Sequence, residues 1–139
     1  MQVRMASKND LVQVCELIRE LGYEAAESDL AMQLDTYVDM QTSALMVTET
    51  PAGDLSGLIS GHLIPLMHQP GNVGRITAFV VREDHRSTGI GTVLLEALES
   101  WFRDRGCFRF EVTSGDHRAR AHKFYDSKGY ISGGYRYIK

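Results

Sequence analysis

The chain has few cysteines, and their placement argues against a role in holding the fold together. Cys15 and Cys107 are the 2 cysteines among 139 residues, and they lie in different apolar segments. A disulfide scaffold or a cysteine metal site needs more cysteines in a recognisable spacing. We therefore interpret both as buried thiols of a protein from a reducing compartment.

The chain also lacks a strong charge of either sign and any long hydrophobic run. Its net charge is −3 and its pI about 5.9, which argues against a broad electrostatic grip on nucleic acid. No apolar run approaches the length of a membrane span, and the first residues lead into a strand-like pattern rather than the apolar core of a signal peptide. We expect a cytoplasmic protein that binds neither nucleic acid nor membrane.

What the sequence does contain is the pattern of a single α/β domain spanning 1–139. With 139 residues, 43% of them hydrophobic, the chain can bury one core and is too short for two. Apolar periodicity and turn residues predict the order β-α-α-β-β-β-α-β-α-β, with helices on a mixed sheet. The expected strands are 3–6, 44–50, 55–66, 75–81, 107–113 and 130–138, with a loop over 68–74 and helices that follow Ser7, Ser28, the glycine loop that ends at Gly91, and Arg118.

The most informative stretch is a short glycine loop between an expected strand and an expected helix. It reads Arg86-Ser87-Thr88-Gly89-Ile90-Gly91. Glycines let the backbone approach a ligand closely, and the start of the next helix offers N–H groups and the positive end of its dipole. Together these features predict a site for phosphate oxygens. The loop has neither the Lys-Ser/Thr pair of a nucleoside-triphosphate loop nor, with Leu94 in its place, the third glycine of a dinucleotide fingerprint.

A second motif lies one expected strand and one expected helix further along. Residues 121–130 read Ala-His-Lys-Phe-Tyr-Asp-Ser-Lys-Gly-Tyr. This run resembles the A-x-x-F-Y-x-x-x-G-[FY] signature of the GNAT superfamily of acyl-CoA N-acyltransferases, and the glycine loop resembles the R-x-x-G-x-G diphosphate loop of the same superfamily. The element order over the whole chain also matches. The resemblance implies an α/β fold with a mixed, mostly antiparallel sheet flanked by helices.

The resemblance implies an N-acetyltransferase that moves an acetyl group from acetyl-CoA to a primary amine of a small molecule or protein by direct attack on the thioester. Such a reaction needs a positioned thioester, a neutral amine and a proton for the departing thiolate. A non-catalytic acyl-CoA-binding or regulatory module of the same fold is the alternative. An unrelated phosphate-binding module is a third interpretation, but it must treat the second motif as chance. Single-domain relatives commonly pair, so a homodimer is expected, and no metal is implied.

The resemblance also implies which residues hold acetyl-CoA. In the family the strand before the glycine loop is splayed from the next strand. Its backbone binds the pantetheine arm and polarises the thioester carbonyl, for which the N–H of Val81 is the expected donor. Arg118 stands where relatives often carry an asparagine that contacts the pantetheine arm, and it can pair with a phosphate or an acidic substrate instead. The expected cofactor-binding residues are Phe79, Val80, Val81, Arg86, Ser87, Thr88, Gly89, Ile90, Gly91, Thr92, Arg118, Ala121 and Phe124.

Two residues are predicted to transfer protons, Tyr125 and Glu111. Tyr125 aligns with the tyrosine often assigned as the acid that protonates the thiolate, and a phenol with a pKa of about 10 suits that role. A buried aromatic with a satisfied hydroxyl is the other interpretation. The base is open, because residues 75–79, where many relatives carry a glutamate, hold no carboxylate. Glu111 on the next expected strand can act through an ordered water or be an ion-paired surface residue, and His62 and Glu24 are other candidates.

The acceptor site in this fold usually lies near the connection between the first two helices. Tyr23, Glu24 and Glu27 place aromatic and acidic groups there, which suits a cationic amine. The identity of the acceptor is not determined by the sequence, because a few scattered side chains set such pockets.

Overall fold

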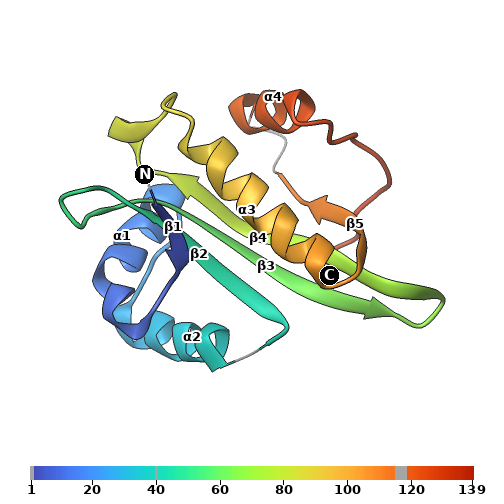
Figure 1. Ribbon diagram of the computed structural model, residues 1–139, viewed down its shortest axis with the longest axis horizontal. Coiled ribbons are helices and arrows are strands. Elements are labelled where there is room, and N and C mark those ends of the chain that lie inside the picture. The colour runs from blue at the N-terminus through green and yellow to red at the C-terminus, as the bar shows by residue number, and fades with distance from the viewer. Residues whose placement is uncertain (1, 40, 115–118) are drawn as a thin grey trace.

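The computed structural model describes residues 2–39, 41–114 and 119–139, and it confirms a mixed α/β fold (Figure 1). In these ranges, four α-helices and two short 3₁₀ helices accompany one sheet of five strands. The elements in chain order are β1 (Gln2–Met5), η1 (Lys8–Asp10), α1 (Leu11–Leu21), α2 (Glu27–Asp39), β2 (Ser43–Glu49), β3 (Leu55–Leu66), β4 (Gln69–Val81), η2 (Glu83–His85), α3 (Ile90–Asp104), β5 (Cys107–Val112) and α4 (Ala119–Ser127).

The order of the strands in the sheet follows their order in the chain. The first four strands are antiparallel neighbours, and β5 pairs in parallel with β4. A parallel pair needs a crossover connection, which η2, the glycine loop and α3 supply. The sheet is therefore mixed and mostly antiparallel, as the resemblance implied.

The two faces of the sheet carry separate apolar clusters, because alternate strand residues point to opposite faces. In Figure 1, α1 and α2 (blue) gather on one side of the strands and α3 (yellow to orange) runs along the other. On the α3 side, Ile59 and Ile76 pack with Leu98 and Phe102. On the α1 side, Leu58 and Val80 pack with Leu17.

Glycines of the central strands let α3 lie close to the sheet. A Cβ at Gly74 of β4 would lie 2.5 Å from the ring of Phe102, and one at Gly61 of β3 would lie 2.6 Å from it. Real side chains do not approach this closely, so only glycine fits below the Phe102 ring. α3 is thus tightly held on β3 and β4.

Strand β4 is paired along its length with β3 but only partly with β5. Pairing with β5 stops at Ile76↔Val112, whereas pairing with β3 continues to Val81↔Gly57. The register skips Thr77, which is an extra residue opposite the Ser60–Gly61 step of β3. The segment 77–81 therefore leaves one backbone edge without a strand beside it, which confirms the splayed strands that the resemblance implied.

The predicted last strand, 130–138, is wrong for the part of the chain that the structure describes. After α4 the chain forms no strand there, and Ile131, Tyr135 and Tyr137 are more than nine-tenths exposed. The alternation of apolar residues is broken by Gly133 and by Gly134, whose φ of 75° is not extended. With no apolar surface to cover, these side chains do not drive pairing with β5.

The connection between β3 and β4 is shorter than predicted. The pattern predicts a loop over 68–74, but β4 begins at Gln69 and pairs with β3 through Leu66↔Gln69 and Pro65↔Asn72. The ladder continues past Pro70 and Gly71 because a register shift between Pro65 and Leu66 accommodates them. A smaller difference is that α2 begins at Glu27, one residue before Ser28.

The structure agrees with the interpretation of the two cysteines as thiols. Cys15 is buried and Cys107 partly buried, both are free thiols, and burial raises the pKa of each. None of the helices in the described ranges is long and apolar enough to cross a membrane.

Candidate active site

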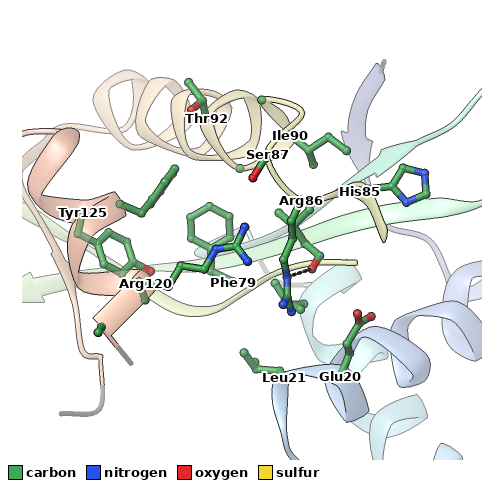
Figure 2. A pocket seen from close by; sticks show the side chains of 17 residues that line it. Glu20, Leu21, Phe79, His85, Arg86, Ser87, Ile90, Thr92, Arg120 and Tyr125 are labelled. Atoms are coloured by element: carbon green, nitrogen blue, oxygen red, sulfur yellow. Dashed lines mark hydrogen bonds between the residues drawn. The ribbon is translucent and has the colours of Figure 1, made fainter. Parts of the chain in front are cut away.

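A cavity of about 780 Å³ lies beside the unpaired half of β4 (Figure 2). Its walls come from the end of α1, the end of β4, the glycine loop with the start of α3, and the first half of α4. The structure brings most of the expected cofactor residues together here, with Tyr125 beside them. Those that line the cavity are Phe79, Val80, Val81, Arg86, Ser87, Gly89, Ile90, Gly91, Thr92, Ala121 and Phe124.

Two expected cofactor residues are not part of this wall as described. The hydroxyl of Thr88 donates to the carbonyl of His85, which holds the loop in its turn. Arg118 lies outside the described residues.

Backbone geometry explains the shape of the glycine loop. Gly89 caps α3 with a φ of 87°, a left-handed conformation that glycine adopts at little cost. Ser87 has a φ of 65°, which is uncommon for a residue with a side chain. The first hydrogen bond of α3 runs from the N–H of Val93 to the carbonyl of Gly89 at 3.1 Å. The N–H groups of Ile90, Gly91 and Thr92 come before it and have no acceptor inside the helix. Amides in this position bind anions.

Arg86 ties the glycine loop to the end of β4. Its Nε donates to the carbonyl of Val81 at 3.2 Å, the dashed contact in Figure 2. The end of β4 is also anchored to α1, because Arg82 Nη2 lies 3.3 Å from the Glu16 carboxylate. The Arg86 guanidinium therefore lines the cavity at the end of β4.

An aromatic wall closes the other end of the cavity. Phe79 of β4 lies 5.6 Å from Phe124 and 6.3 Å from Tyr125 between ring centroids, both in edge-on geometry. Figure 2 shows Tyr125 and Arg120 on α4 reaching toward the space beside Phe79. A Cβ at Gly91 would lie 3.5 Å from Phe124, so the start of α3 and this wall are in contact distance.

Tyr130 shows what a structural tyrosine looks like in this fold. Its ring lies 5.6 Å from that of Tyr125, and its hydroxyl donates to the carboxylate of Glu99 on α3 at 2.8 Å. Burial and the Glu99 carboxylate raise the pKa of Tyr130 well above the usual value. Tyr130 thus fastens the chain after α4 to α3, while Tyr125 lines the cavity.

Glu111 does not line the cavity. Its two carboxylate oxygens lie 3.4 Å from Arg75 Nη1 and 2.9 Å from Arg109 Nε. Arg75 also donates to the hydroxyl of Thr113 at 2.8 Å. The carboxylate therefore binds two guanidinium groups across β4 and β5.

His62 of β3 is held by three hydroxyl groups. Its Nδ1 lies 2.9 Å from Ser43 Oγ, and its Nε2 lies 2.8 Å from the Tyr37 hydroxyl and 3.0 Å from Thr77 Oγ1. Burial, and then the charge of Arg75, lower the pKa of His62 below its usual value of 6.5. The ring is therefore neutral near pH 7.

The expected acceptor residues lie just beyond the end of α1. Tyr23, Glu24 and Glu27 are exposed and are not among the cavity-lining residues, although Leu21 is. Arg19 Nη2 donates to the carbonyl of Ala25 at 2.6 Å and so fixes this connection.

Sequence reasoning missed five residues that line the cavity. For Glu20, Leu21, His85 and Ala119 no local pattern shows which elements the fold brings together. Arg120 could have been found, because it lies one helical turn before Phe124 and shares its face. The five residues are Glu20, Leu21, His85, Ala119 and Arg120.

Within 2–39, 41–114 and 119–139, no group of three His, Cys, Asp or Glu side chains could hold a metal ion.

Comparison with known proteins agrees with this geometry. A model of the acetyltransferase (GNAT) family matches residues 11–130. An aminoalkylphosphonate N-acetyltransferase of Salmonella typhimurium is 30% identical over 127 residues, which cover 91% of this chain and 79% of that protein. An aminoglycoside N(6')-acetyltransferase type 1 of Klebsiella aerogenes is 29% identical over 98 residues, which cover 69% of this chain and 64% of that protein.

A solved structure shows the same fold. The aminoglycoside N-acetyltransferase AAC(6')-Iy, in complex with CoA, superposes with a TM-score of 0.89 at 13% identity, over 99% of this chain and 92% of that one. Because this identity is low, the likeness supports the architecture rather than a shared acceptor.

Proposed function

This chain belongs to the acetyltransferase (GNAT) family, and from that premise we propose that the cavity beside β4 is where it transfers an acetyl group from acetyl-CoA to a primary amine. One observation carries the proposal: the same cavity is lined by the glycine loop, the unpaired half of β4 and Tyr125. These are the three parts that acetyl transfer needs, namely an anion site, a backbone edge and a proton donor.

The glycine loop holds the diphosphate of coenzyme A. The amides from Ser87 to Thr92, around the start of a 15-residue helix, supply donors and the positive end of the helix dipole, whereas the N–H of Arg86 donates to the carbonyl of Glu83 at 3.3 Å. The Arg86 guanidinium adds charge, and Gly91 leaves room for the phosphates to approach the backbone. The cavity, of about 780 Å³, is in the size range of small-molecule sites.

The open edge of β4 holds the pantetheine arm. Residues Phe79, Val80 and Val81 offer backbone groups that no neighbouring strand takes on the β5 side. We assign the N–H of Val81 to the thioester carbonyl, and Ala121 and Phe124 to the opposite wall. Acetyl-CoA supplies an activated acyl group, and the chain positions it against the amine.

Tyr125 supplies the proton to the departing thiolate. It stands in the aromatic wall beside Phe79, which aligns its ring and limits its movement. The amine nitrogen bonds to the acetyl carbon and loses a proton to a base or to solvent, the carbon–sulfur bond breaks, and the phenol proton moves to sulfur.

The acceptor approaches from the connection between α1 and α2. Tyr23, Glu24 and Glu27 line its path with aromatic and acidic groups that attract a protonated amine. The two sequence relatives are named for acetylating aminoalkylphosphonates and aminoglycosides, so a small-molecule amine is the first class to test.

We also propose that the protein is a cytoplasmic homodimer. Two free thiols suit a reducing compartment. The exposed apolar residues after α4 and the outer edge of β5 offer surfaces for a second copy. Light scattering is expected to give twice 15.6 kDa, and a mass of 15.6 kDa would contradict the dimer.

The experiment that tests the function is an amine panel. Purified protein with acetyl-CoA is assayed for release of free coenzyme A with an aminoalkylphosphonate, an aminoglycoside, a polyamine, an amino acid and a lysine peptide. Turnover with at least one amine is expected. Tight binding of acetyl-CoA in calorimetry with no turnover on any amine would instead describe a binding module of the same fold.

A further inference from the structure

A row of polar side chains crosses the sheet where β4 parts from β5. His62 of β3 is the register partner of Arg75 of β4, and Arg75 is the partner of Glu111 of β5. Side chains directly opposite one another on neighbouring strands point to the same face. That face carries α2, because His62 contacts Tyr37 with ring centroids 5.2 Å apart.

Thr77 stands at the end of the row, where the pairing of β4 with β5 stops. Thr77 is exposed, lies one residue past the last β4–β5 pair and stands two residues before Phe79 in the cavity wall. Its hydroxyl is 3.0 Å from His62 Nε2 and 2.8 Å from Ser60 Oγ. A continuous set of hydrogen bonds therefore leads from the place where β4 and β5 stop pairing to the partly buried imidazole of His62.

We propose that His62, acting through the hydroxyl of Thr77, accepts the proton that the acceptor amine loses. The inference rests on the proposed acetyl transfer. As the amine nitrogen bonds to the acetyl carbon and the carbon–sulfur bond breaks, the nitrogen gives its proton to Thr77 Oγ1 while the Thr77 proton moves to His62 Nε2. Tyr125 protonates the sulfur, His62 afterwards returns its proton to solvent, and the Tyr125 phenolate regains a proton from solvent.

The hydroxyl partners suit an imidazole that changes its charge. In the neutral ring, Nδ1–H donates to Ser43 Oγ and Nε2 accepts from Tyr37 and Thr77. A hydroxyl can donate or accept, so both partners of Nε2 can rotate to accept once it is protonated. The Nε2–H can then donate to one of them, and Thr77 can turn its own proton to Ser60 Oγ, 2.8 Å away.

The charged groups around His62 set when it is neutral. Tyr37 faces it from α2 and Ser43 from β2, while Arg75 is the charge beside it on β4. Burial and Arg75 both disfavour the imidazolium, so its pKa lies below 6.5 and the ring is a free base at neutral pH. Glu111 lies on the far side of Arg75, and its two carboxylate oxygens contact the guanidinium groups of Arg75 and Arg109. We therefore assign Glu111 to positioning Arg75 rather than to accepting a proton.

The first test replaces the imidazole by an amide that cannot take the proton. His62→Gln keeps hydrogen-bonding groups for Ser43 and Tyr37. With an amine found in the panel, kcat at saturating amine is measured from about pH 5 to 8, because kcat reports groups of the bound complex. Wild type is expected to lose kcat as the pH falls through the pKa of His62, which lies below 6.5. His62→Gln is expected to have kcat lower by about 10²-fold and no acidic limb.

The second test examines the path through Thr77 and the competing carboxylate. Thr77→Val is expected to lower kcat like His62→Gln, and Thr77→Ser to restore it. Glu111→Gln is expected to keep the acidic limb. Wild-type kcat in Thr77→Val, or an acidic limb that persists in His62→Gln and disappears in Glu111→Gln, overturns the proposal.

Controls separate this inference from the proposed function. His68→Gln replaces an exposed histidine in the β3–β4 turn and is expected to behave as wild type. The affinity for acetyl-CoA and the Tm are expected to stay near wild type in His62→Gln, whereas a purely structural His62 would lower the Tm and leave the pH profile of the remaining activity unchanged. An inactive wild type overturns the proposed function, whereas an active wild type with an unaltered His62→Gln variant overturns only the role of His62.

Discussion

The two halves of β4 have the same backbone conformation but different neighbours. Residues 72–76 have β3 on one side and β5 on the other, and Gly74 lies under Phe102 at a distance that excludes any side chain. Residues 78–81 pair with β3 on one side, and residues 79–81 line the cavity. One strand is therefore scaffold in its first half and binding site in its second.

This difference shows that a missing strand partner can be a functional feature. A backbone N–H or C=O needs a hydrogen-bonding partner, and an edge without a strand can take an extended ligand as that partner. The paired half fixes the position of the open half, because α3 is clamped on Gly61 and Gly74 by Phe102. Variants of the open half should therefore change turnover and affinity, and variants of the paired half should change stability.

The largest effect is expected beside the open half, from Tyr125→Phe on α4, whose ring contacts Phe79. The change keeps the ring and its edge-on contacts and removes the phenolic proton. General acids contribute about 10²–10⁴ in rate, so kcat should fall by that factor while the affinity for acetyl-CoA and the Tm change little. Steady-state kinetics, calorimetry and thermal melting measure the three quantities. Near-wild-type kcat would make Tyr125 a packing residue.

Over the paired half, Phe102→Ala on α3 should act on stability instead. Phe102 is fully buried and contacts Gly61 and Gly74, so its removal leaves a cavity under α3. Such substitutions lower the free energy of unfolding by about 3–5 kcal/mol. Urea denaturation followed by circular dichroism measures the loss. A destabilisation under about 1 kcal/mol would show that α3 is not clamped in this way.

Two substitutions at Gly91 sharpen the contrast within the glycine loop. Gly91→Glu places a negative charge where the diphosphate is proposed to bind, and acetyl-CoA affinity should fall by about 10²-fold, since hydrogen bonds to charged groups are worth about 1.5–3 kcal/mol each. Gly91→Ala is the matched control, because its Cβ would make ordinary contacts with Phe124 and Phe79 at 3.5 and 3.7 Å. Calorimetry with acetyl-CoA compares them, and equal affinities would contradict the diphosphate assignment.

A smaller effect is expected far from β4, at Asp10. Arg4 donates to both its oxygens at 2.8 and 2.9 Å, and this pairing lowers the pKa of Asp10 below 3.8. A lowered carboxylate pKa stabilises the fold above pH 3.8, and this contribution is lost as the pH falls through the folded-state pKa. Asp10→Asn should cost about 1–3 kcal/mol at pH 7 and much less below the folded-state pKa. Urea denaturation of wild type and Asp10→Asn at pH 7 and at a pH below the folded-state pKa of Asp10 tests this. An equal loss of unfolding free energy at the two pH values would refute it.

Local signals predicted much of the fold. Turn residues Pro51 to Asp54 and the apolar run after them predicted the bounds of β3, and Gly22 marked the end of α1, where it has a φ of 111°. The glycine loop marked the start of α3, which begins at Ile90, inside the loop. These signals are reliable because a left-handed residue or a helix cap depends on the backbone of only a few neighbours.

Non-local pairing decided what the sequence pattern misread. The alternation of Tyr135 and Tyr137 predicts a strand, but a strand needs a partner and a surface to cover, and the described chain offers neither to this segment. Conversely Pro70 and Gly71 predict a loop, yet the partner strand β3 holds them in the ladder.

For the candidate site, the sequence by itself determined the glycine loop, the aromatic pair Phe124 and Tyr125 and the absence of a carboxylate on residues 75–79, because each is written in a few adjacent residues. Only the tertiary structure decided that the end of α1 reaches the glycine loop, that Glu111 binds two arginines and that His62 leads through Thr77 to the place where β4 and β5 stop pairing. Those relations depend on register between strands and on the packing of distant elements, which no local pattern encodes.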